Sequence, residues 1–166
     1  DHSERIDPNA RDNGGWTALM LACSRGHKDV VQLLLDHINP MEHCNSEESG
    51  LNVKDKNGWT AFMWACFDGH KDVVQLLLDH SERIELNARN NGGWTALMNA
   101  CSRGHKDVVQ LLLDNSERID LNARDNFGMT AFMLACKREH KDVVKLLLAY
   151  SDRNIELNAS NDNGNT

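Results

Sequence analysis

Two kinds of apolar cluster alternate along the chain, and both have the spacing of short helices. Thr95 precedes the mainly apolar segment 96–101, and its hydroxyl is placed to cap a helix N-terminus. Gly104 then suits the left-handed residue that ends many helices. The second cluster predicts a helix over about 106–114 that is apolar on more than one face. Segments rich in asparagine and glycine, such as 87–93, separate these helix pairs and predict turns.

This pattern of turn, helix, turn and longer helix repeats with a period of about 35 residues. Residues 81–115 match residues 3–37 at 30 of 35 positions, and residues 116–150 match residues 81–115 at 24 of 35. The helix-capping threonines are 43, 35, 35 and 36 residues apart, so one connector is longer than the others. These threonines are Thr17, Thr60, Thr95, Thr130 and Thr166. The predicted units span about 12–46, 55–89, 90–124 and 125–160, with a truncated fifth at 161–166 and an inserted loop at about 38–50.

Neither helix of a unit can bury its apolar surface alone, so neighbouring units must stack and share a core. The composition agrees with such an array, because aromatic residues make up only 5% of the 166 residues, which is few for one large central core. We therefore expect a single all-α domain built as a solenoid of stacked helix-turn-helix units.

Each unit also carries a fixed set of residues. In the first unit the set is Asp12, Gly15, Thr17-Ala18-Leu19, Ala22, Gly26-His27, Val31 and Leu33-Leu34-Leu35, with Asn9-Ala10 before it. The set resembles the ankyrin repeat, and it recurs in four units that cover nearly the whole chain. The resemblance implies an ankyrin-repeat solenoid with β-hairpin loops.

The chain departs from the ankyrin pattern at three positions of the unit. Alanine and methionine, as at Ala96 and Met98, stand where the family usually has proline and histidine, so the usual threonine–histidine hydrogen bond is absent. Glu139 stands where a glycine usually ends the first helix. If this residue keeps the left-handed conformation, we expect a strain of about 1 kcal/mol in the fourth unit.

The resemblance implies a protein-binding scaffold without catalysis, whose partners contact the hairpin tips and the exposed face of the first helices along a concave surface. A repeat protein supplies its own control, because a residue that is the same in every unit serves the stack, whereas one that changes is free to serve a partner. The candidate partner-binding residues are Trp16, Arg25, Trp59, Trp64, Phe67, Asp68, Trp94, Asn99, Arg103, Phe127, Met129, Lys137 and Arg138. Two alternatives stay open: a structural or engineered repeat stack with no natural partner, and a regulatory segment of a larger enzyme or channel.

The aromatic candidates have two interpretations. Trp64 and Phe67 lie three residues apart, so they share a helix face and are suited to anchor a partner. Alternatively, Trp64 packs against neighbouring first helices and Phe67 only covers it. For Trp16, Trp59 and Trp94, stacking along the hairpins and contact with a partner are equally good interpretations.

Charge restricts the class of partner. The 18 basic and 25 acidic residues give a net charge of −7, which is the wrong sign for general binding of nucleic acid. No apolar run approaches the ~20 residues that span a bilayer. Three glutamates of the inserted loop supply part of the negative charge, whereas basic residues are expected along the concave side. These glutamates are Glu42, Glu47 and Glu48. We therefore expect a protein partner with an acidic or mixed surface, and neither nucleic acid nor a membrane.

Four of the five cysteines occupy one slot of the repeat. These cysteines are Cys23, Cys66, Cys101 and Cys136. Equivalent residues of stacked helices lie about 10 Å apart, which is too far for a disulfide, so we expect four buried free thiols. Unpaired thiols indicate a reducing compartment, the cytoplasm or the nucleus. Cys44 has His43 beside it but lacks further spaced ligands for zinc, and we expect no metal and no cofactor.

A serine, a histidine and an aspartate lie close together in the first unit, at Ser24, His27 and Asp29. The serine position holds Phe67 and Lys137 in two other units while the histidine persists, and no oxyanion loop accompanies the set. We therefore expect no enzymatic activity, and histidines that make backbone hydrogen bonds where the second helices begin.

The ends of the sequence fall inside repeat units, and the first unit keeps the apolar second-helix residues of an internal one. Arrays need polar outer caps for solubility. We therefore expect either that the chain is a segment of a longer array or that it stacks end to end on other copies.

Overall fold

The computed structural model describes residues 7, 9–38, 50–150, 155–157 and 164. Within them the chain forms four pairs of α-helices and one 3₁₀ helix, η1 (Ser81–Arg83), and no residue is assigned to a strand. The first helices of the pairs are α1 (Ala18–Ser24), α3 (Ala61–Asp68), α5 (Ala96–Arg103) and α7 (Ala131–Lys137). The second helices are α2 (Lys28–His37), α4 (Lys71–Asp79), α6 (Lys106–Asp114) and α8 (Lys141–Ala149). Cys44 and most of the predicted inserted loop and truncated fifth unit lie outside the described residues.

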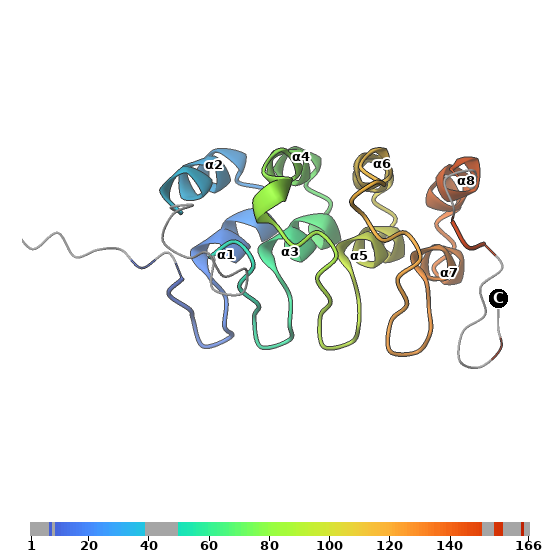
Figure 1. Cartoon of the computed structure of the whole chain (residues 1–166), viewed down its shortest axis with the longest axis horizontal. Coiled ribbons are helices and arrows are strands. Elements are labelled where there is room, and N and C mark those ends of the chain that lie inside the picture. Colours follow the sequence, from blue (N-terminus) through green and yellow to red (C-terminus); the bar gives the residue numbers. More distant parts are fainter. Residues whose placement is uncertain (1–6, 8, 39–49, 151–154, 158–163, 165–166) are drawn as a thin grey trace, which may run out of the picture.

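The helices form two layers. Each first helix packs against the first helix of the next pair, and each second helix packs against the next second helix (Figure 1). The loops that join the pairs extend from the first-helix layer on the side away from the second helices (Figure 1). The predicted all-α solenoid is confirmed.

Threonine begins every first helix, as the sequence predicts. The Thr95 hydroxyl accepts a hydrogen bond from the Met98 backbone N–H at 3.4 Å, which satisfies one donor that the first helical turn leaves without an intrahelical partner. The equivalent bond forms in the other three pairs, at Thr17, Thr60 and Thr130. Each second helix follows a histidine and has an aspartate in its first turn, where the helix dipole favours negative charge.

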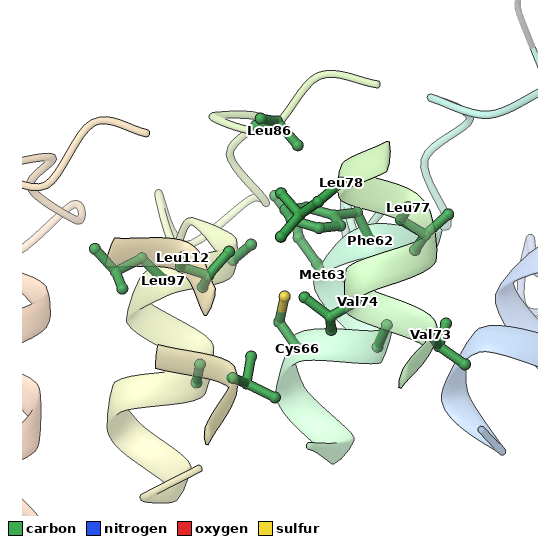
Figure 2. Packing of buried hydrophobic residues seen from close by; sticks show 14 of the residues in the cluster. Phe62, Met63, Cys66, Val73, Val74, Leu77, Leu78, Leu86, Leu97 and Leu112 are labelled. Atoms are coloured by element: carbon green, nitrogen blue, oxygen red, sulfur yellow. The ribbon is translucent and has the colours of Figure 1, made fainter. Parts of the chain in front are cut away.

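A continuous apolar core joins the layers and the pairs. In Figure 2, Cys66 of α3 lies beside Val74 of α4 and below Phe62, while Leu97 of α5 and Leu112 of α6 lie on the side of the next pair. All five side chains are at most 2% exposed. Burial of a large aliphatic or aromatic side chain contributes about 1.5–3 kcal/mol, so the interfaces between pairs hold the array together.

The predicted hairpin loops are present as tight turns. In the first, the Gly15 N–H donates to the Asp12 carbonyl at 2.9 Å and the Asp12 N–H donates to the Trp16 carbonyl at 3.0 Å. Neighbouring tips are joined to one another, since the Asn126 N–H donates to the Gly92 carbonyl at 3.1 Å. The loops therefore form a hydrogen-bonded row rather than independent turns.

The repeated histidines and asparagines join one unit to the next. His105 Nε2 lies 2.8 Å from the Phe67 carbonyl of the preceding pair, and because a carbonyl only accepts, this nitrogen carries the proton. His70 and His140 make the same bond. Asn52 uses both ends of its amide on the following unit: Nδ2 donates to a carbonyl at 3.0 Å, and Oδ1 accepts a backbone N–H at 2.9 Å. The expectation that the histidines bind backbone is confirmed for these three residues.

Gly69 shows why a glycine ends the first helix. Its φ is +79°, and a Cβ at this position would lie 2.6 Å from Nδ1 of His105. Glu139 keeps the left-handed conformation, with φ +58°, as the sequence suggests. Within the described residues no later histidine packs against Glu139, so only the backbone strain remains.

Candidate functional site

Four aromatic side chains gather where two hairpins meet α3, and we call them the aromatic cluster. Trp16 and Trp59 come from the hairpins, and Trp64 and Phe67 from α3. Trp64 lies between the two hairpin tryptophans, with ring centroids 4.3 Å from Trp16 and 4.4 Å from Trp59. Phe67 meets Trp59 edge-on at 5.2 Å and Trp64 at 5.9 Å. All four side chains are half-buried, so the cluster keeps part of its aromatic surface accessible to solvent.

A hydrogen bond fixes the central tryptophan. Trp64 Nε1–H donates to the Asp55 carboxylate at 3.3 Å, and the other carboxylate oxygen of Asp55 accepts two backbone N–H groups of its hairpin. Trp64 therefore packs against its neighbours, as one interpretation holds, and also keeps an exposed part. The hairpin residue Trp59 stacks on Trp64, whereas the Trp16 ring contacts Trp64 at a tilt of 35°.

Arg103 of α5 continues this surface toward the third and fourth units. Its guanidinium carbon lies 4.6 Å from the centroid of the Phe67 ring, which is within the range of a cation–π contact. The arginine is exposed, so the ring holds one face of the guanidinium while its edges stay accessible to solvent.

A pocket of about 440 Å³ opens beside Arg103, and we call it the arginine pocket. Its lining residues are Phe67, Trp94, Ser102, Arg103, Arg138 and His140. The His140 ring is fixed by the hydrogen bond from Nε2 to the Ser102 carbonyl at 2.9 Å. The pocket therefore combines two aromatic walls and two cations on a rigid base.

Asn99 occupies on α5 the slot that Trp64 occupies on α3. Its side chain is 0% exposed, and within the described residues neither its amide nitrogen nor its carbonyl oxygen has a hydrogen-bond partner. An unpaired buried amide is unusual, because most buried polar groups are hydrogen-bonded. Of the predicted candidates, Asn99 is the one that this arrangement hides from a partner.

Comparisons with known families agree with the two-layered array. A model of ankyrin repeats in three copies matches residues 2–90 and 41–125, and a model of ankyrin repeats in many copies matches residues 105–148. The chain belongs to the ankyrin repeat family. Ankyrin repeats generally mediate interactions between proteins, and the family is typically non-catalytic.

Two curated proteins resemble part of this ankyrin array. BCL-6 corepressor-like protein 1 of Mus musculus is 49% identical over 47 residues, which are 28% of this chain and 2% of that protein. Its counterpart from Homo sapiens is 58% identical over 31 residues, 19% of this chain and 2% of that protein. The chain therefore spans only a small part of the length of these relatives.

The remaining candidates are spread along the array. Arg25, Lys137 and Arg138 are exposed, and Asp68 is half-buried. At the hairpin tip of the fourth unit, Phe127 is 70% exposed, while Met129 behind it is half-buried. Repeat comparison did not select Ser102 and His140 as candidates, although both line the arginine pocket. Of these two, only Ser102 could have been found from the sequence, because the residue in its slot differs between units, whereas the histidine is the same in every unit.

The basic residues that lead into the hairpins serve the ankyrin stack. Arg11 Nη1 donates to the Lys54 carbonyl at 3.2 Å, and Arg89 donates to the Arg124 carbonyl. Arg124 forms an ion pair with Glu156 at 3.6 Å. Part of the expected row of basic side chains therefore binds the next unit of the array. The two arginines of the arginine pocket are not among the residues that lead into the hairpins.

The expectation of four buried thiols is wrong for Cys136. Cys23, Cys66 and Cys101 are buried, but Cys136 is exposed, because no further first helix packs against α7 in the described part of the chain. Burial raises the pKa of the Cys23 thiol to about 12 and that of the Cys66 thiol well above its ordinary value. These four cysteines are free, and among the described residues no group of three metal-ligating side chains occurs.

Among the described residues, no side-chain hydrogen bond joins the serine, histidine and aspartate of either set. His105 donates from Nε2 to Phe67 of the preceding unit rather than to the Ser102 hydroxyl, and His70 binds the carbonyl, not the hydroxyl, of Ser24. These histidines are therefore occupied by the stack. In the part of the chain that the structure describes, no helix has the length and apolar character needed to cross a membrane.

Proposed function

We propose that the chain is a non-catalytic protein-interaction module that binds a partner through its hairpin tips and the concave face of its first helices. The aromatic cluster is the observation that carries this proposal. Trp64 and Phe67 replace smaller or polar residues of other units, and the stack does not need them, since α1 holds Leu21 and Ser24 in the same slots. Aromatic side chains held rigidly and left half-exposed are typical of interface anchors.

The partner that fits this face has an acidic or mixed surface. Arg25, Arg103 and Arg138 share one slot of the repeat, where Asp68 stands in the second unit, and Lys137 lies beside them. The net charge of −7 argues against nucleic acid, because binding to phosphates needs an excess of positive charge.

A reducing compartment, the cytoplasm or the nucleus, is the proposed location. The buried free thiols of three neighbouring units support it, because unpaired cysteines persist where disulfides are kept reduced. The names of the two relatives, which call them corepressor-like, are consistent with the nucleus.

Affinity capture from a cell lysate tests the proposed function. The wild-type chain is compared with a triple variant, Trp64→Ala, Phe67→Ala and Trp94→Ala. A matched control carries three substitutions on the exposed side of α4: Lys71→Ala, Gln75→Ala and Asp79→Ala. Circular dichroism verifies that all three chains fold.

A specific protein retained by the wild type and the α4 control, and lost by the triple variant, supports the concave surface. Equal capture by the triple variant contradicts this assignment of residues. If no chain captures a specific protein, a purely structural repeat stack accounts for the result better.

End-to-end association of copies is a second candidate function, because apolar side chains are exposed on both outer pairs. Leu33 of α2 is 61% exposed and Val30 is 46% exposed, whereas the equivalent Leu76 and Val73 of α4 are at most 7% exposed. On α8, Leu148 is 45% exposed. Light scattering over a concentration series tests this candidate: growth of the mean mass supports it, and a strict monomer at high concentration contradicts it.

A further inference from the structure

The arginine pocket contains two cations that have no acidic partner among the described residues. Within the described part of the chain, the guanidinium groups of Arg103 and Arg138 take part in neither a salt bridge nor a side-chain hydrogen bond. No acidic residue lines the pocket. The site therefore has an unbalanced positive charge although the whole chain carries −7.

Arg103 is oriented before any ligand binds. The Phe67 ring lies against one face of its guanidinium, with 4.6 Å between the guanidinium carbon and the ring centroid. The N–H donors of a guanidinium lie in its plane, so a ring on one face leaves them available at the edges. A side chain that is already ordered loses less conformational entropy on binding.

The other walls suit a peptide rather than a free ion. Phe67 and Trp94 supply apolar surface, and the volume of about 440 Å³ exceeds what one carboxylate group needs. The Ser102 carbonyl is occupied by His140 Nε2, so the base of the pocket is not a competing acceptor for the arginines. The space thus accommodates an acidic side chain together with part of the backbone that carries it.

We propose that the arginine pocket binds the carboxylate side chain of a glutamate or aspartate in an extended segment of a protein partner. This inference rests on the proposed function and names the chemistry that the concave face recognises. The carboxylate accepts charge-assisted hydrogen bonds from Arg103 and Arg138, and the neighbouring apolar part of the segment packs on Phe67 and Trp94.

Asp68 determines the orientation in which an acidic segment lies along the first helices. It stands at the end of α3 in the slot that Arg103 occupies at the end of α5 and that Arg138 occupies at the C-cap of α7. A negative charge at this position repels an acidic segment that extends toward the second unit. The acidic residue of the partner therefore lies over the third and fourth units, with an uncharged or basic residue toward Asp68.

Fluorescence anisotropy with a labelled peptide of alternating leucine and glutamate tests the proposal. Matched peptides replace every glutamate by glutamine or by phosphoserine, and a single-stranded oligonucleotide of equal charge serves as a second polyanion. We expect the glutamate peptide to bind at least about tenfold more tightly than the glutamine peptide, since charged hydrogen bonds are roughly twice as strong as neutral ones.

Substitutions locate the binding on the pocket. Arg103→Gln and Arg138→Gln are each expected to weaken binding of the glutamate peptide about tenfold, and Asp68→Asn is expected to tighten it. Lys145→Gln, on the exposed side of α8, removes the same charge at a residue that does not line the pocket, and it is expected to change the affinity less than about twofold.

Four results would overturn the proposal: equal affinity for the glutamate and glutamine peptides, equal loss from Lys145→Gln, binding of the phosphoserine peptide alone, or equally tight binding of the oligonucleotide. The capture experiment separates this failure from failure of the proposed function. If the Arg103→Gln/Arg138→Gln variant still captures the protein that the triple aromatic variant loses, the protein-binding function stands and the carboxylate pocket does not.

Discussion

Replacement of Asn99 by leucine is expected to stabilise the chain. The Asn99 side chain is 0% exposed, and neither end of its amide has a hydrogen-bond partner among the described residues. A buried polar group without a partner costs about 1–3 kcal/mol. The equivalent slot of α7 holds Leu134, which is 4% exposed, so the array already accommodates a leucine at this place.

The expected gain follows from these two observations. Leucine removes the cost of the unpaired amide and retains a side chain of similar size, so the free energy of unfolding should rise by about 2 kcal/mol. For a chain of this length, 1 kcal/mol shifts the melting temperature by about 2–4 °C, which predicts an increase of about 4–8 °C.

Urea unfolding followed by circular dichroism measures the effect. The midpoint should rise without a change in the m-value, because the surface exposed on unfolding stays the same. Leu134→Asn is the matched reverse substitution, and it should lower the midpoint by a similar amount. A midpoint of Asn99→Leu at or below that of the wild type would refute the inference that the amide is buried without a partner.

Four further predictions concern the stack and its thiols. Gly69→Ala should lower the free energy of unfolding by at least about 2 kcal/mol, because a Cβ combines left-handed strain with a close contact to His105; a denaturation midpoint equal to the wild type would contradict it. Glu139→Gly should raise the melting temperature, since it removes a strain of about 1 kcal/mol, and a scanning calorimeter would show no increase if the strain is absent. The free energy of unfolding should fall as the pH rises from about 9 toward 12, because Cys23 keeps its proton in the folded chain while the unfolded thiol ionises near 9.0. A Cys23→Ala variant should show a shallower decline in pH-dependent unfolding, and an identical slope would rule out this thiol as the cause. A thiol reagent should modify Cys136 first in the folded chain, and mass spectrometry of the labelled protein would disprove this if a buried cysteine reacted as fast.

Local chemistry made much of the fold predictable. Thr95 caps α5, Gly104 ends it and α6 runs from Lys106 to Asp114, as the sequence alone indicates. Each of these features depends on residues within one unit, so the local sequence is sufficient to predict it. The repeated histidines were also predictable, because a residue that persists while its neighbours change points to a contact common to all units.

Features that depend on contacts between units were harder to predict from the sequence. The sequence shows that Trp64 and Phe67 share a face, but it does not show that Trp64 lies between two hairpin tryptophans or that Arg103 covers Phe67. Variation between units marked Asn99 as a binding candidate, although its side chain is fully buried. Repetition predicted a buried Cys136, yet burial in this slot requires a neighbouring first helix that the described residues do not provide.

Proton–nitrogen correlation spectra test the central claim, that a protein partner binds the concave face of the first helices. The four tryptophan indoles are natural probes of this face, because three belong to the hairpins and Trp64 belongs to α3. Addition of the captured partner should shift the indole signals of Trp64 and Trp94 and leave the backbone amides of α4 and α6 unchanged. Shifts confined to α4 and α6, with all four indole signals unmoved, would contradict the account.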